Sequence, residues 1–310
     1  LKSIIKDKAA AYKEEVIGIR RHLHAHPELS FQEYETSKYV CGKLDEYGIP
    51  YKNGYVETGI VGLIEGNNPG KKVIALRGDM DALPILEEND VAYKSKNDGV
   101  MHACGHDVHT SSLLGAAKIL NELKDQFEGT VKLIFQPGEE RLPGGASLMI
   151  KEGVLENPVP NNIFGQHVYP QLDAGKVGFK PGMYMASTDE LFMTIHGKGG
   201  HAALPNLTVD PVLITAHILT ALQQLVSRHS HPTAPTVLSF GKIIGNGATN
   251  IIPDKVELEG TFRAMDEEWR AEAHHKMTKM AESIAEGMGG ACEFEICLLY
   301  TSPSPRDRSL

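Results

Sequence analysis

The residues from His102 to His109 combine three imidazoles, one thiol and one carboxylate within eight positions. Zinc, cobalt, nickel and manganese ions bind to mixtures of such ligands. The apolar residues from Leu113 to Leu123 have helical spacing, so the cluster leads into a buried helix. Each histidine taken alone is better explained as a cap or a core residue. Cys104 and His106 together favour a metal site.

Two carboxylates, Asp79 and Asp81, follow a strand that we predict at 73–77. Open α/β sheets place ligand-binding groups where buried strands end. Solvated loop acids explain this pair equally well from the sequence alone.

A second acidic pair, Glu139 and Glu140, follows a predicted strand at 130–135 and a Pro-Gly turn. Adjacent side chains diverge in such geometry, so one carboxylate can face a metal ion while the other faces a water molecule. A metal ion lowers the pKa of its water from near 16 to about 7, and a carboxylate within reach can accept the proton. An exposed acidic pair at a helix end is the alternative, but the buried strand and the turn favour function.

The elements that must position these side chains form an α/β pattern. Near-continuous apolar strands alternate with helices, which predicts a mostly parallel sheet with helices on both faces. In such a sheet the loops after the strands gather at one edge, where His167 can join the residues above. The predicted helices are 5–23 and 33–47, and the other predicted strands are 60–64 and 163–168.

A second domain is predicted after residue 180. Its elements follow the order β-α-β-β-α-β, which is the ferredoxin-like split βαβ arrangement, and we expect it to be an inserted lid. We therefore divide the chain into a metal-binding catalytic domain at 1–180, a lid and dimerisation domain at 181–300, and a foreign Pro/Ser/Arg tail at 301–310. The predicted elements of the second domain are strands at 190–196, 236–244, 255–263 and 291–300 and helices at 210–227 and 266–288.

The composition excludes several classes of protein. Hydrophobic residues make up 41% of the 310 positions, enough for a sizeable core, and the net charge of −9 argues against nucleic-acid and anionic-membrane partners. Four cysteines are too few for a disulfide scaffold, and no apolar run is long enough to cross a bilayer. We therefore expect a cytoplasmic protein.

Four motifs together resemble the aminoacylase-type metallopeptidase family. The resemblance is to its amidohydrolase branch, which contains hippurate hydrolase, N-acyl-L-amino acid amidohydrolase and the indole-acetyl-amino-acid hydrolases, and it extends from His22 to about Phe294. The motifs are His-Ala-Cys-Gly-His-Asp-Val-His, Arg-Gly-Asp-Met-Asp-Ala-Leu-Pro, Gln-Pro-Gly-Glu-Glu and Gly-Lys-Gly-Gly-His-Ala-Ala-Leu-Pro.

The resemblance implies metal-dependent hydrolysis of the amide bond of N-acyl amino acids or similar small amides. Glu139 is similar to the general base of the family. Asp79 occupies the histidine position of a family His-x-Asp motif, which leaves the roles of Asp79 and Asp81 open. The residues that resemble ligands of two divalent ions (zinc, manganese, cobalt or nickel) are Cys104, His106, Glu140 and His167, with Cys104 able to bridge.

In the predicted lid, the resemblance implies substrate contacts and a homodimer. His201 resembles the residue that reaches a partner's active site and stabilises the oxyanion. Asn250 and Arg263 resemble contributors to the binding of the substrate amide and carboxylate. Ordinary loop residues and a strand-end surface charge are the alternatives.

One departure from the family concerns its last metal-binding histidine, which belongs to a returning part of the catalytic domain. We expect this chain to be truncated before that segment, and His274 and His275 in the predicted lid helix are poor substitutes. The alternative function is therefore a catalytically inactive fragment that binds metal or dimerises.

Overall fold

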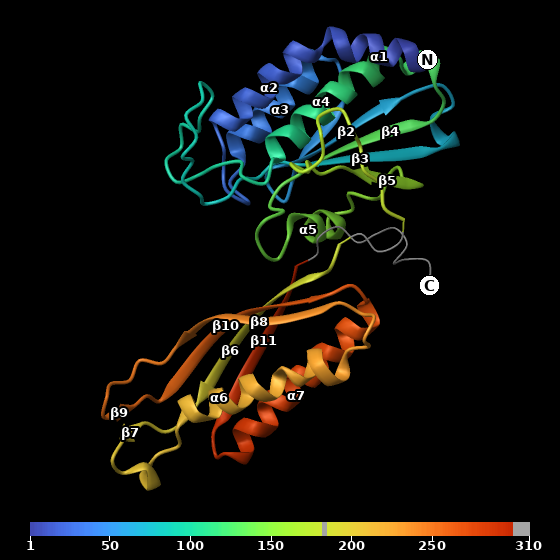
Figure 1. Ribbon diagram of the computed structural model, residues 1–310. Coiled ribbons are helices and arrows are strands. Elements are labelled where there is room, and N and C mark those ends of the chain that lie inside the picture. Colours follow the sequence, from blue (N-terminus) through green and yellow to red (C-terminus); the bar gives the residue numbers. More distant parts are fainter. Residues whose placement is uncertain (182–184, 300–310) are drawn as a thin grey trace. The chain divides into compact units, whose positions relative to one another are not determined.

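The chain forms two compact units, the first from Leu1 to Val177 and the second beginning at Gly178. The computed structural model describes residues 1–181 and 185–299 (Figure 1). The predicted tail at 301–310 lies outside the described residues. Each unit is described by itself below.

The first unit contains a mixed five-stranded sheet in the order β1-β2-β4-β3-β5. The pairs β3–β4 and β3–β5 are parallel, whereas β1–β2 and β2–β4 are antiparallel. The α/β class is thus correct, but the prediction of a mostly parallel sheet is wrong. The strands are β1 (Tyr51–Tyr55), β2 (Gly59–Glu65), β3 (Val73–Asp79), β4 (Thr130–Gln136) and β5 (Asn162–Gly165).

The physical reason for the difference is a hairpin. The strand β1 is short and largely exposed, so it carries no apolar signal in the sequence. Val56 and Glu57 in the following turn have positive φ angles of 48° and 68°, which reverse the chain directly into β2. A connection this short can join only antiparallel strands, because a parallel pair needs a crossover.

Helices cover both faces of this sheet, with α2, α3 and α4 on one face and α5 on the other (Figure 1). The central strand β4 is buried along its whole length. The apolar stripe that predicts one N-terminal helix is divided at Tyr12 into two. The helices are α1 (Lys2–Ala11), α2 (Lys13–Ala25), α3 (Tyr34–Glu46), α4 (His106–Glu122) and α5 (Gly145–Lys151), with single 3-10 turns at Pro69–Lys71 and Lys124–Gln126.

The parallel register brings three chain segments to one edge of the sheet. Asp79 pairs with Gln136, so β3 and β4 end side by side. Arg77 pairs with Gly165, so the chain leaves β5 at the same edge. The backbone of His109, in the first turn of α4, lies 3.3 Å from where a Cβ on Gly78 would be. The loops after these strands and the start of α4 therefore meet.

The second unit has a four-stranded antiparallel sheet in the order β11-β6-β10-β8. Its helices α6 and α7 pack on one face of this sheet around a core that includes Leu191, Ile218 and Phe262 (Figure 1). The elements are β6 (Thr188–His196), β7 (Gly200–His201), α6 (Pro211–Leu222), β8 (Thr236–Ile244), β9 (Ile251–Ile252), β10 (Lys255–Ala264), α7 (Glu267–Gly287) and β11 (Ala291–Leu299), with a 3-10 turn at Pro205–Leu207 and a π-helical turn at Leu225–His229. In the part of the chain that the structure describes, no helix is both long and apolar enough to cross a membrane.

A buried histidine ties the loop between β3 and α4 to helix α2. The two nitrogens of His24 contact Asp107 Oδ2 (Nδ1, 2.8 Å) and Glu87 Oε1 (Nε2, 3.1 Å). Glu87 also accepts a hydrogen bond from the backbone of Ser95. The hydrogen bond to Asp107 raises the pKa of His24; burial opposes this, and Glu87 adds to it. His24 thus acts as a cationic brace between two carboxylates.

Replacing His24 with glutamine should reduce stability by about 1.5–3 kcal/mol near pH 6, the usual contribution of hydrogen bonds to a charged group. Because the folded-state pKa is raised, this stabilisation is fully present below the unfolded pKa near 6.5 and is lost as the pH rises through the folded pKa. Urea unfolding of both proteins from about pH 6 to pH 10 measures the difference. An equal loss across the whole range would contradict the brace, and the exposed His217→Gln variant is the control.

Candidate metal centre

Gly105 allows the residues on both sides of it to face one point. It has a φ of +89°, and a Cβ there would lie 2.4 Å from Val168 Cγ2. Only glycine adopts this conformation without strain and also admits the neighbouring segment. Cys104 Sγ consequently lies 3.2 Å from His167 Nε2, although 63 positions separate them in the chain.

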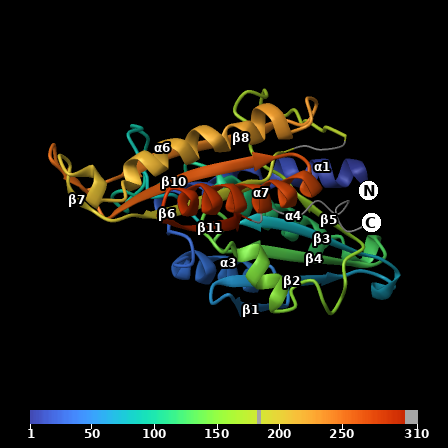
Figure 2. The same cartoon turned by 90° about the horizontal axis from the view of Figure 1, so that it is seen from below.

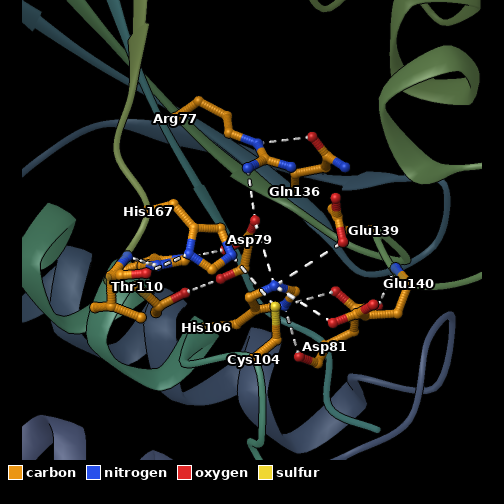
Figure 3. A network of polar contacts seen from close by, with 12 residues as sticks. Arg77, Asp79, Asp81, Cys104, His106, Thr110, Gln136, Glu139, Glu140 and His167 are labelled. Atoms are coloured by element: carbon orange, nitrogen blue, oxygen red, sulfur yellow. Dashed lines mark hydrogen bonds and ion pairs between the residues drawn. The ribbon is translucent and has the colours of Figure 1, made fainter. Parts of the chain in front are cut away.

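His106 lies at the centre of the cluster and is almost fully buried. Its Nδ1 donates to the backbone oxygen of Asp81 at 2.9 Å, so Nε2 is the nitrogen that can bind a cation in place of a proton. This Nε2 is 3.7 Å from Glu140 Oε1 and 3.9 Å from Glu139 Oε2 (Figure 3). This nitrogen therefore points into a group of carboxylates.

Three sets of possible metal-ligand atoms occur among the described residues, each set within 4.8 Å, and His106 belongs to all three. The four residues expected to bind metal fall into two overlapping sets. The sets are Cys104, His106 and His167; His106, Glu139 and Glu140; and Asp79, His106 and His109.

The donor atoms fit a divalent cation. His106 Nε2 and Glu140 Oε1 are buried and have no hydrogen-bond partner. Burial of an unpaired polar atom is costly, and a bound cation would satisfy both atoms. Burial lowers the pKa of His106, but Asp81, Cys104 and the surrounding carboxylates outweigh it and raise that pKa well above its usual value. The site thus attracts positive charge, and thiol, imidazole and carboxylate are ligands of the ions predicted.

Glu139 lies beside the cluster and differs chemically from an ordinary surface acid. Burial raises the pKa of this carboxyl; the nearby His106 opposes the rise, and the negative charge of Glu140 adds to it. A higher pKa makes a carboxylate a better proton acceptor near neutral pH. The arrangement is suited to proton transfer.

Two acids not assigned a role from the sequence hold the turn that carries Glu139 and Glu140. The fully buried Glu33 accepts hydrogen bonds from the backbone of Gly138 (2.8 Å) and from Thr58 Oγ1 (2.8 Å). Asp81 Oδ2 accepts from the backbone of Glu140 (2.9 Å). Nothing in the sequence marks Glu33, which lies at the start of a predicted helix, because these two partners are 25 and 105 positions away.

Replacing Gly138 with alanine should reduce both stability and turnover. Gly138 has a φ of +54°, and the added Cβ would lie 2.3 Å from the Phe31 ring. Left-handed backbone strain and the clash together should cost at least about 2 kcal/mol and displace Glu139. Urea unfolding and turnover measurements test this expectation.

Gly42→Ala is the matched control for this change. Gly42 is in the helix α3 with no atom within 4 Å of an added Cβ, so alanine should be neutral or stabilising by up to about 1 kcal/mol. Wild-type stability and turnover in the Gly138→Ala variant would show that the turn tolerates a side chain.

The three predicted substrate-binding residues all lie in the second unit, and the structure brings two of them together. His201 is in β7, opposite Ile251, and the backbone of the adjacent Ala202 donates to Asn250 O at 3.0 Å. Figure 1 and Figure 2 both show β7 at one end of this unit. Arg263 is exposed and lies eight residues along β10 from Lys255, the end of β10 that follows β9. This separation is about 26 Å at the usual rise per residue. Arg263 does not join His201 and Asn250.

The strand ends of this mixed α/β sheet gather a thiol, imidazoles and paired carboxylates around one buried nitrogen, and this arrangement suits a metal-dependent hydrolase. The chain belongs to the family described as peptidase family M20/M25/M40, whose sequence pattern matches residues 75–300. The resemblance to the amidohydrolase branch is confirmed by the relatives that follow.

An N-acyl-L-amino acid amidohydrolase from Geobacillus stearothermophilus is 43% identical over 293 residues, covering 94% of this chain and 78% of the relative. An N-acetylcysteine deacetylase from Bacillus subtilis is 42% identical over 92% of this chain and 74% of its own length. A solved Bacillus subtilis protein described as a dinuclear metal-binding peptidase of the M20 family superposes with a TM-score of 0.77 at 38% identity, covering 94% of this chain and 75% of that one.

Proposed function

We propose that this chain hydrolyses the amide bond of N-acyl amino acids, with Glu139 as general base. In this proposal two divalent ions are held by the predicted set of Cys104, His106, Glu140 and His167. The observation that carries it is the unpartnered Nε2 of His106, which faces Glu140 with Glu139 beside it. The relatives are named for hydrolytic activities, which favours a hydrolase over an inactive fragment, and their names support an N-acyl amino acid as substrate.

In the proposed reaction, Glu139 transfers a proton and Asp81 holds other residues in position. When bound, the ions lower the pKa of a water molecule to about 7 and polarise the substrate carbonyl. Glu139 accepts a proton from the attacking water as the new C–O bond forms. It then donates that proton to the amide nitrogen as the C–N bond breaks, giving a carboxylate and an amine. Asp81 keeps His106 and the backbone of Glu140 in position during these steps.

The second unit supplies the lid in this proposal. His201 and Asn250 would contact the substrate from one end of the unit, with His201 stabilising the oxyanion in a partner's site. Because Arg263 does not lie with these two residues, it would bind the carboxylate of the substrate in the other site of the dimer. A homodimer through this unit is supported by its edge strand β8, and Ile243 in β8 and Leu213 in α6 are exposed apolar residues. Sedimentation at micromolar concentration tests the dimer, and a monomer would contradict it.

The test of the proposed function is turnover by the chain loaded with manganese, cobalt, zinc or nickel. N-acetyl and N-benzoyl amino acids are offered, and the free amine is measured together with the number of bound ions. We expect two ions per chain and release of the amine with at least one metal. Two tightly bound ions without turnover of any of these amides would contradict the proposed reaction.

A further inference from the structure

Asp79 is fixed at the end of β3 by three neighbours. It is buried, and its Oδ2 accepts from Arg77 Nη1 at 2.5 Å. Its Oδ1 contacts His109 Nδ1 at 2.6 Å, and its backbone oxygen accepts from Thr110 Oγ1 at 2.6 Å. Arg77 is held in turn by Gln136 Oε1 at 2.9 Å (Figure 3). Both carboxylate oxygens of Asp79 are therefore engaged by protein groups.

The hydrogen bonds of His109 identify its tautomer. Its Nε2 accepts from the backbone N–H of Val168 at 3.0 Å, so this nitrogen carries a lone pair that is already used. Its Nδ1 must then carry the hydrogen and donate to Asp79. Neither nitrogen is left to bind a cation, in contrast to Nε2 of His106.

Val168 links the position of His109 to the orientation of His167. The backbone oxygen of Val168 is 2.8 Å from His167 Nδ1, which donates to it and leaves Nε2 facing Cys104 Sγ at 3.2 Å. His167 is exposed and lies in the loop that follows the short strand β5. Its orientation therefore depends on Val168, whose N–H is held by His109.

We infer that Arg77, Asp79 and His109 are positioning residues that orient His167 toward Cys104, and that His109 is not itself a metal ligand. The inference rests on the proposed metal-binding role of Cys104 and His167. Asp79 and His109, which belong to the third possible ligand set, then hold the ligands of the other two sets in place and do not bind an ion themselves.

The variant His109→Leu removes both hydrogen bonds and fills the buried position with an apolar side chain. We expect two ions still to bind, with the affinity for at least one of them lowered about 10–100-fold, the usual effect of removing a group that orients a ligand. The readouts are the number of cobalt ions bound, their affinity by competition with a chelator, and hydrogen exchange at the Val168 amide. That amide should exchange faster in the variant even without metal.

Loss of one of the two ions would identify His109 as a ligand and overturn the inference, as would unchanged exchange at Val168. Asp79→Asn provides a second variant that keeps an acceptor oxygen for His109 while losing the charge paired with Arg77. It should retain more cobalt affinity than Asp79→Ala, and equal affinity in the two would also overturn the inference. If wild-type protein binds no cobalt, the proposed function fails, while the exchange experiment still tests the contact between His109 and Val168.

Discussion

Replacing Glu139 with glutamine should lower kcat by about 10²–10⁴-fold, the usual contribution of a general acid–base group, with the number of bound ions unchanged. Glutamine preserves the shape of the side chain but cannot accept the proton from water. Glu139 lies close enough to His106 Nε2, at 3.9 Å, to act on a water molecule in the cluster. The measurements are kcat with an N-acetyl amino acid and the metal content of the purified variant.

Glu140→Gln is the matched comparison for this prediction. The two side chains are adjacent and similarly accessible, 23% for Glu139 and 20% for Glu140, so solvent exposure cannot explain a difference between the variants. The Glu140 variant should lose affinity for metal, whereas the Glu139 variant should retain it. Normal turnover by Glu139→Gln would eliminate the proposed base, and loss of metal would make Glu139 a ligand instead.

Replacing His106 with alanine should abolish binding of at least one ion and lower kcat/KM by at least about 10³-fold, because several kcal/mol of charge stabilisation disappear. We expect this effect because His106 is common to every possible ligand set among the described residues. Calorimetric titration with cobalt and turnover of the same N-acetyl amino acid measure the two losses.

Because His106 is buried, urea unfolding must accompany these measurements to separate loss of metal from loss of fold. His275→Ala provides a control at an exposed position on α7 and should retain both ions. If the His106 variant bound two ions at wild-type affinity, His106 would not be a metal ligand.

The sequence by itself determined the kinds of chemical group in the site and the segments that carry them. The apolar strands before Asp79 and Glu139 and the helix after Cys104 are readable from periodicity, and all three are observed. Such signals are local, since they depend on whether neighbouring residues are apolar. The direction of the strands is not local, and the hairpin of the polar strand β1 with β2 was missed for that reason.

The family resemblance singled out His106 among the three histidines of the 102–109 stretch, but only the tertiary structure supplied the physical reason. His102 is buried and lies outside every possible ligand set in the described chain, His109 has both nitrogens hydrogen-bonded, and His106 has one nitrogen without a hydrogen-bond partner. The sequence shows three identical side chains at similar spacing. Which nitrogen can bind a metal ion depends on the partner of the other nitrogen, and those partners come from segments about 25 to 60 positions away in the chain.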